Sequence, residues 1–188
     1  MLNKLINITR KRRHKTFKAL FDTLEVMSDA SFTMPSQDLI DKEDFKKSLS
    51  FLRSYTGSLG TFNAYRRELE RFLQWSGHIA RKSLKDITRD DMETFITFYK
   101  NPPKSWIGIK KEHRFIVKND QRVPNPRWKP FVVRLQSSPQ KESDHTQRFE
   151  LSDTAIKDIF AILNSFYNYL VQETYVSINP LSLIRQKS

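Results

Sequence analysis

Lysine and arginine are the residues of this sequence whose number and spacing point most directly to chemistry. The 188-residue chain holds 33 of them against 21 aspartates and glutamates, a formal net charge of +12. Residues 1–21 contain seven basic and no acidic side chains, and residues 100–148 contain 12 basic and four acidic ones. Clustered cations of this kind favour a polyanionic partner, because ammonium and guanidinium groups neutralise phosphates.

Groups suited to catalysis or metal binding are scarce. The sequence has no cysteine, which excludes disulfides, thiol catalysis and cysteine-ligated metals. Its four histidines lack the i, i+4 spacing of a helical metal site, and no phosphate-binding loop or nucleophile motif occurs. Asp90-Asp91 and the pair Glu68/Glu70 are interpreted as solvated carboxylates on helix faces. We therefore expect no catalytic residue, cofactor, metal or small-molecule substrate, and this chain is not expected to be an enzyme by itself.

Five helices are expected to position these charges, because apolar side chains recur at three- and four-residue steps. They are predicted around residues 17–27, 41–52, 61–76, 88–99 and 152–170. Their expected N-caps, beyond the first helix, are Asp41, Thr61, Thr88 and Ser152.

Helical periodicity is lost between Lys104 and Arg148, where the sequence predicts a long basic loop or a small β excursion. Arg114–Val117 and Phe131–Val133 are expected to be strands of a hairpin. The predicted fold class is all-α: an N-terminal helix and a small helical bundle, with a basic insertion at residues 101–150 between the last two helices.

Three stretches are informative in their order and joint spacing. They are Thr61–Trp75 with its Tyr65-Arg66-Arg67 and Phe72-Leu73, Leu84–Met92 with Leu84-Lys85-Asp86-Ile87-Thr88, and Leu151–Pro180 with Phe166-Tyr167-Asn168-Tyr169-Leu170 and Asn179-Pro180. Taken together, they resemble the N-terminal core-binding domain of tyrosine recombinases, the phage integrases and their chromosomal relatives. The resemblance covers roughly residues 41–182.

This resemblance implies a four-helix, SAM-like orthogonal bundle at residues 41–182 that forms one half of a clamp around duplex DNA. Residues 1–40 would be a basic helix and linker, and residues 183–188 the start of a linker to a catalytic domain. The family's catalytic Arg and His and its nucleophilic Tyr lie in that following domain, beyond residue 182. The chain, which ends at Ser188, is thus expected to bind double-stranded DNA for integration and recombination without cleaving it, alongside other recombinase protomers.

The family pattern also bears on two tyrosines that could be mistaken for the catalytic nucleophile. Tyr169 and Tyr175 are not interpreted as the nucleophile, because the catalytic arginines and histidines do not precede them. The sequence departs from the family at Asp158 and Ile159, where arginine is frequent. The connection between the last two helices is also longer than usual.

The candidate DNA contacts fall into three groups. On the helix that opens at Thr61, the apolar stripe predicts that Asn63, Arg66, Arg67 and Glu70 point mostly outward, next to a helix N-terminus suited to phosphate. In the insertion, the expected phosphate contacts are Lys104, Lys110, Lys111, Arg114, Arg122, Arg127, Lys129 and Arg134. On the last helix, the candidates are Lys157 and Asn164.

Other classes of function stay open at this point. An RNA-binding helical module has the same charge and aromatic content, and a protein–protein adaptor could dock an acidic partner on its basic loop. Membrane-surface binding is weakened by Asp22 and Glu25, and no apolar run approaches the roughly 18 residues of a membrane span. A cytoplasmic protein of prokaryotic or phage origin is expected. The run Arg10–Lys15 is interpreted either as a second DNA grip or as a disordered basic tail.

Overall fold

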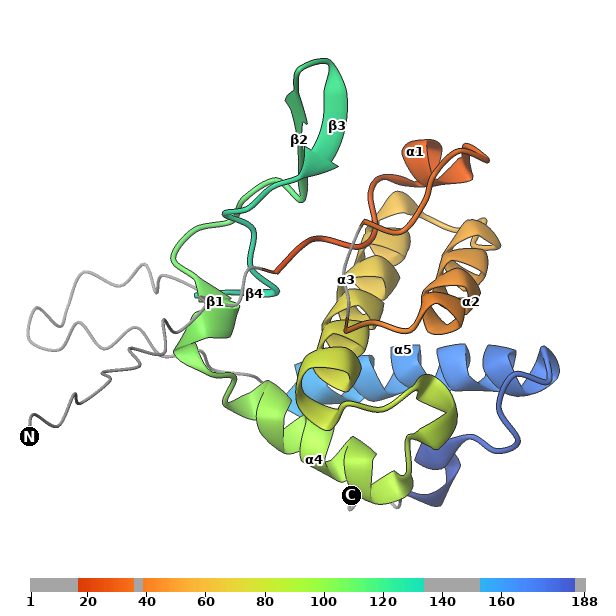
Figure 1. Cartoon of the computed structure of the whole chain (residues 1–188). Helices are drawn as coiled ribbons and strands as arrows, with labels where there is room; N and C mark the ends of the chain where they lie inside the picture. Colours follow the sequence, from red (N-terminus) through yellow and green to blue (C-terminus); the bar gives the residue numbers. More distant parts are fainter. Residues whose placement is uncertain (1–16, 36–38, 134–152, 185–188) are drawn as a thin grey trace, which may run out of the picture.

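A computed structural model describes residues 17–35, 39–133 and 153–184 (Figure 1). The α-helices of this part are α1 (Leu24–Ser28), α2 (Lys42–Arg53), α3 (Leu59–Trp75), α4 (Arg89–Lys100) and α5 (Asp153–Gln172). The last four form a bundle in which α5 crosses α3. The predicted mostly helical fold is therefore confirmed. Within the described ranges, no helix has the length and apolar character needed to cross a membrane.

Hydrogen bonds at the helix N-termini explain where the helices begin. Asp41 and Thr88 cap α2 and α4 as predicted. Helix α3 begins earlier than expected, because Ser58 Oγ accepts the backbone N–H of Thr61 at 3.2 Å. The prediction that Thr61 is the N-cap is therefore wrong, and this residue lies in the first turn. The predicted cap of the last helix, Ser152, falls outside the described residues.

An aromatic cluster around α3 forms the centre of the core. The rings of Phe72 and Trp75 lie 5.0 and 5.2 Å from that of Phe95 on α4. Phe72 also lies 6.0 Å from Tyr167 on α5. All four side chains are buried. Large aromatic side chains remove much apolar surface from water, so this cluster holds α3, α4 and α5 together.

The N-terminal segment differs from the predicted helix at 17–27. Residues 17–23 lie outside any helix, Thr23 has an extended backbone, and only Leu24–Ser28 of this segment is helical. Three polar side chains of α3, spaced four residues apart, bond to the backbone of every second residue of this segment. Gln74 Nε2 donates to the carbonyl of Lys18, Glu70 accepts the N–H of Leu20, and Arg66 donates to the carbonyl of Asp22.

The spacing of these side chains along α3 matches the spacing of their backbone partners along an extended chain, which explains why the N-terminal segment adopts the extended form. Four residues of an α-helix rise about 6 Å, and two residues of an extended chain span about 6.6 Å. The side chains of Arg66, Glu70 and Gln74, here called the polar ridge, therefore satisfy the backbone much as a neighbouring strand would. Phe17, Leu20 and Phe21 still reach the core, so the apolar pattern that predicted a helix is satisfied without one.

The described part of the basic insertion, which ends at residue 133, contains four short strands. β2 (Phe115–Lys118) and β3 (Gln121–Pro124) form an antiparallel hairpin, and β1 (Ile107–Gly108) pairs in parallel with β4 (Phe131–Val132). The two predicted strand segments are thus real, but the prediction that they pair with each other is wrong. The reason is local: Asn119 and Asp120 both adopt left-handed φ values, 50° and 56°, which close a tight two-residue turn directly after β2.

Candidate nucleic-acid interface

Buried carboxylates of α3 hold the insertion against the bundle. Glu70 is fully buried and forms an ion pair with Arg114, which precedes β2. The guanidinium of Arg114 also lies 5.2 Å from the ring centre of Trp128. The prediction that Glu70 points outward is therefore wrong, because its carboxylate is needed by both Leu20 N–H and Arg114. For the same reason Arg114 is an anchor and not an exposed phosphate contact.

Glu68 is a second buried carboxylate on α3, in contrast to the expected solvated one. It accepts hydrogen bonds from Arg67 Nε at 2.6 Å and from Tyr99 Oη at 2.6 Å, and Arg71 Nη1 lies 3.1 Å away. Burial opposes ionisation of Glu68, but the nearby cations of Arg71 and Arg67 outweigh it and lower its pKa. Arg71 Nε in turn donates to the carbonyl of Pro130, at the start of β4.

The predicted pair Arg66 and Arg67 is divided by the structure. Arg66 is half-buried, and its second terminal nitrogen donates to Asn63 Oδ1 at 2.8 Å. Together with its bond to the Asp22 carbonyl, this contact turns Arg66 and Asn63 towards the N-terminal segment. The predicted outward direction is wrong for Arg66. Arg67 keeps about half of its side chain exposed, at 49%.

Asp22 joins three parts of the chain at one point. Its carboxylate binds Arg122 of β3, with Nη2 and Oδ1 2.8 Å apart, while its carbonyl accepts from Arg66 of α3. The hydrogen bond to Asp22 raises the pKa of Arg122. Arg122, a predicted phosphate contact, is thus held by a carboxylate that is itself only 2% exposed. The hairpin is fixed to the bundle by this pair and by the pair Arg114–Glu70.

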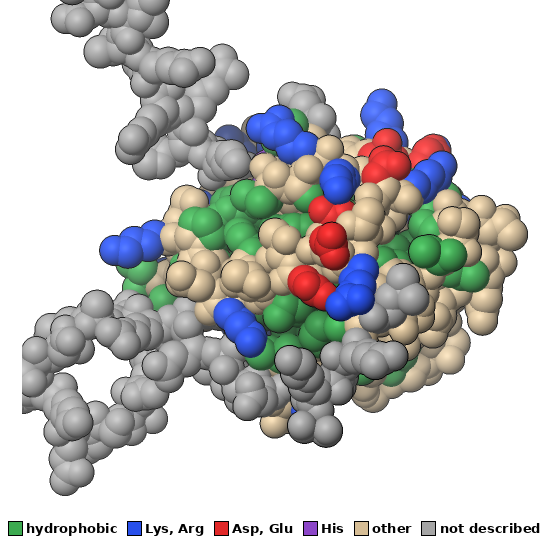
Figure 2. Space-filling model, turned by 90° about the horizontal axis from the view of Figure 1, so that it is seen from below, with side chains coloured by type: hydrophobic (Ala, Val, Ile, Leu, Met, Phe, Trp, Pro, Cys, Tyr) green, Lys and Arg blue, Asp and Glu red, His purple; other side chains and the backbone are tan. Residues whose placement is uncertain are grey.

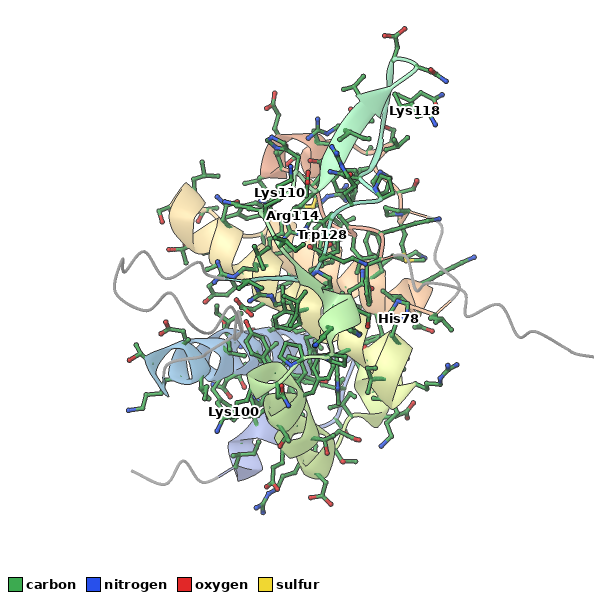
Figure 3. The ribbon with its side chains drawn as sticks, turned by 90° about the vertical axis from the view of Figure 1, so that its left-hand side faces the viewer. His78, Lys100, Lys110, Arg114, Lys118 and Trp128 are labelled. Atoms are coloured by element: carbon green, nitrogen blue, oxygen red, sulfur yellow. The ribbon has the colours of Figure 1, made fainter. Side chains whose placement is uncertain are left out.

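Several cations of the insertion are exposed and are not paired with a buried carboxylate. Lys104, Lys110, Lys111 and Lys118 are exposed, and so is Arg127. Lys110 and Arg127 approach Glu112 only loosely, with N–O distances of 3.6 and 3.9 Å. Figure 3 shows Lys118 at the end of the hairpin and Lys100 at the opposite end of the same side. The predicted contact Arg134 lies outside the described residues.

The N-terminal segment enters the described structure beside this insertion. The ring of Phe17 packs 4.4 Å from that of Trp106 and 5.3 Å from that of His78. Lys129 Nζ, from the half-buried side chain of Lys129, lies 5.3 Å from the centre of the Phe17 ring. The described parts of the two basic regions are therefore adjacent where Phe17 meets Trp106 and Lys129.

The face formed by α4 has a mixed charge. Figure 2 views the molecule from the side on which α4 lies in Figure 1, and basic and acidic side chains alternate there. Lys82 pairs with Asp91 at 2.7 Å, and Arg89 pairs with Glu93 at 3.0 Å. Such a surface does not gather phosphates as a surface of exposed lysines does.

The candidates at the ends of the bundle are accessible. Thr61 is exposed in the first turn of α3, and its hydroxyl lies 3.0 Å from Ser58 Oγ. Lys157 and Asn164 are exposed on α5 and line one groove of ≈ 270 Å³. Neither of these two residues contacts the insertion through a described hydrogen bond or ion pair, so the structure does not bring all predicted contacts into one cluster.

No group of three or more histidine, aspartate or glutamate side chains among the described residues could hold a metal ion. Tyr175 donates its hydroxyl to Asp44 Oδ1 at 2.8 Å, and burial followed by this bond raises its pKa. The hydroxyl of Tyr175 thus connects the segment after α5 to α2.

Comparison with known proteins identifies a domain family for part of the bundle. Residues 43–109, from α2 to just past the end of β1, match the family described as phage integrase, N-terminal SAM-like domain. No curated protein and no solved structure matches the chain. The chain therefore carries a phage-integrase SAM-like domain, a non-catalytic domain that in known integrases binds DNA.

Several residues that organise the site were not singled out by sequence reasoning. Asp22, Arg71 and Tyr99 complete the ion-pair and hydrogen-bond network, and no local motif marks them. The polar ridge did carry a signal, because Arg66, Glu70 and Gln74 follow Phe62 at four-residue steps along the same helix. Polar side chains that continue a buried stripe in this way indicate a second buried element.

Proposed function

We propose that this chain binds duplex DNA through its SAM-like bundle and that the exposed cations of the insertion supply the grip on the phosphates. The domain family supports the choice of DNA. The observation that carries the proposal is that the cations of the insertion fall into two groups, one paired with buried carboxylates and one exposed. Arg114 and Arg122 hold buried carboxylates, whereas Lys104, Lys110 and Lys111 are left exposed at the surface.

This division favours binding because the cations are presented by an anchored scaffold. A flexible basic loop loses conformational entropy when it is ordered on DNA, and the ion pairs Arg114–Glu70 and Arg122–Asp22 already hold the described part of the insertion in place. Arg67 and Thr61 on α3, Lys157 and Asn164 on α5, and Lys129 extend the proposed contact surface. Arg66 and Asn63 act in this proposal by positioning the N-terminal segment beside the insertion.

The proposed biological role is DNA integration and recombination. In this role the bundle supplies one half of a clamp around duplex DNA, and strand cleavage belongs to a separate catalytic domain of the recombinase. Other protomers assembled on the same DNA would be its protein partners. The mixed charge of the α4 face leaves that side available for contacts other than phosphate.

The test is a fluorescence-anisotropy titration with a 30-base-pair duplex at several salt concentrations. The wild-type chain should bind with a log–log salt slope of about −0.9 for each phosphate contact. The variant K104Q/K110Q/K111Q/R127Q should bind more weakly and with a slope reduced in magnitude by up to about 3.6. A matched variant, K42Q/K46Q/R81Q/R89Q, removes four exposed cations from elsewhere and should keep the wild-type slope.

The outcomes separate the competing functions. Absence of salt-sensitive binding to any nucleic acid would overturn the proposal and favour the adaptor. Tighter binding to single-stranded RNA than to the duplex at equal salt would favour the RNA-binding module. Equal losses in the two quadruple variants would show that total charge matters and that the insertion has no special part.

A further inference from the structure

Asn179, in the segment after α5, forms hydrogen bonds with two asparagines of α5. Asn179 is buried, and its Oδ1 accepts the backbone N–H of Leu181 at 2.9 Å. Its Nδ2 donates to Asn164 Oδ1 and to Asn168 Oδ1, each at 2.8 Å. Asn164 and Asn168 are four residues apart on α5, and both are exposed.

The backbone determines which end of each asparagine amide is the oxygen and which is the NH₂ group. The N–H of Leu181 is only a donor, so the atom of Asn179 that faces it must be the amide oxygen. The other end of the same amide must then be the NH₂ group, which is only a donor. Asn164 and Asn168 consequently have to turn their oxygens towards Asn179, and each is left with its NH₂ group directed away from it.

Both amides line a polar groove on the surface of α5. The larger part, ≈ 430 Å³, is lined by Asn164, Asn168 and Gln172 of α5 and by Ser54 after α2. Asn164 also borders the ≈ 270 Å³ groove that contains Lys157. Among the residues that the structure describes, no aspartate or glutamate lines either part. The larger groove holds the amide donors and hydroxyls, and Lys157 lies in the mostly apolar groove that shares Asn164 with it. These donors suit a ligand that presents acceptor oxygens.

We infer that Asn164 and Asn168 are a donor pair for phosphodiester oxygens of DNA and that Asn179 is the positioning residue that fixes their polarity. This inference rests on the proposed DNA binding and adds a contact site separate from the insertion. Bidentate reading of adenine needs the oxygen and the nitrogen of one amide presented side by side. The oxygens here face Asn179, so the pair is suited to the DNA backbone.

The decisive variant is Asn179→Asp. The introduced carboxylate retains an oxygen for the N–H of Leu181, but its second oxygen is an acceptor, which makes Asn164 and Asn168 turn their NH₂ groups inward. Affinity for the duplex should then fall about tenfold, as expected for two lost hydrogen bonds. If Asn179 is only a structural cap, the variant should bind as the wild type does.

A double-variant cycle separates this effect from the added negative charge. In the background N164A/N168A, the substitution N179D has no amides to turn and should change affinity little. An equal loss in both backgrounds would show that charge repulsion is the cause and would overturn the inference. N164A/N168A alone should also weaken binding about tenfold, which keeps the test decisive if N179D does not fold. Unchanged affinity of that pair would overturn the inference.

Two further comparisons complete the design. Two duplexes of unrelated sequence should show the same loss, and a loss confined to one sequence would overturn the assignment to phosphate. The insertion variant K104Q/K110Q/K111Q/R127Q is measured in parallel. If the wild type fails to bind DNA, the proposed function fails. The other case is that the wild type binds DNA, the insertion variant binds it more weakly, and N179D binds it as tightly as the wild type does. In that case only the present inference fails.

Discussion

Helices α3 and α4 of the same bundle carry similar charged side chains and use them in opposite ways. On α4, Arg89 and Glu93 pair one turn apart, with 52% and 53% of their side chains exposed. On α3, Glu70 is fully buried, and its partner Arg114 comes from the insertion 44 residues later in the chain. The pair Arg89–Glu93 lies on the surface of one helix, whereas the pair Arg114–Glu70 connects two parts of the fold.

The difference shows how burial decides what an ion pair does. An exposed pair competes with water and contributes about 0–1 kcal/mol. Removing one partner of a buried pair leaves an uncompensated charge and costs about 3–5 kcal/mol. The buried pairs of this chain also fix the hairpin and the N-terminal segment to the bundle, so their effect on DNA binding would be indirect.

The largest effect is expected for Glu70→Ala. This change leaves Arg114 without its partner and the N–H of Leu20 without its acceptor. The free energy of unfolding should fall by about 3–5 kcal/mol, measured by urea denaturation at neutral pH. A loss below about 1 kcal/mol would contradict the view that α3 holds the insertion through this carboxylate.

Asp22→Asn should have the next largest effect. The substitution keeps the size of the side chain but removes the charge that holds Arg122, whose side chain is 42% exposed. We expect a loss of about 1–3 kcal/mol, with faster amide hydrogen exchange in β2 and β3 than in α4 or α5. Uniformly faster exchange in all elements would mean that Asp22 supports the whole bundle and has no special relation to the hairpin.

Much of the bundle could be predicted from local sequence. Helices α2 and α4 lie where apolar stripes and the N-caps Asp41 and Thr88 predicted them, because both signals depend only on neighbouring residues. The strand segments in the insertion were also visible as short apolar runs. Their pairing was not, since it depends on the turn at Asn119-Asp120 and on contacts between β1 and β4.

The candidate site was less predictable, because it depends on contacts between distant residues. The apolar side chains Phe17, Leu20 and Phe21 fit a helix and an extended segment equally well, and the polar ridge of α3 selects the extended form. The inward direction of Arg66 follows from that docking. The expected phosphate contacts could not be divided by sequence alone: Lys104, Lys110 and Lys111 lie exposed, whereas Arg114 and Arg122 are engaged by carboxylates from elsewhere in the chain.

The pH dependence of the free energy of unfolding should also distinguish the buried carboxylates of α3 from the exposed ones of α4. Arg71 and Arg67 hold the pKa of Glu68 below its ordinary value of 4.5 despite its burial. An acid with a lowered folded-state pKa adds stability above its unfolded value and loses it as the pH falls through the folded one. We therefore expect Glu68→Gln to flatten the loss of stability below about pH 4.5, relative to the wild type.

This comparison uses the pH dependence and not the stability at neutral pH, because Glu68→Gln also removes the partner of Arg71 and lowers stability there. Urea midpoints measured from neutral pH down to about pH 3 give both quantities. If the variant and the wild type lose stability in parallel below about pH 4.5, other carboxylates dominate the acid transition and the buried site on α3 does not.

The smallest effect is expected for Glu93→Ala, which makes the same glutamate-to-alanine change on the exposed face of α4. The lost pair with Arg89 is exposed to solvent, and alanine has the higher helix propensity, so the two effects oppose each other. The free energy of unfolding should change by less than about 0.5 kcal/mol in the same urea experiment. A loss comparable to that of Glu70→Ala would mean that α4 also anchors a neighbouring element. Because E93A and E70A delete the same groups, any difference between them measures what burial and a distant partner add to a glutamate–arginine pair.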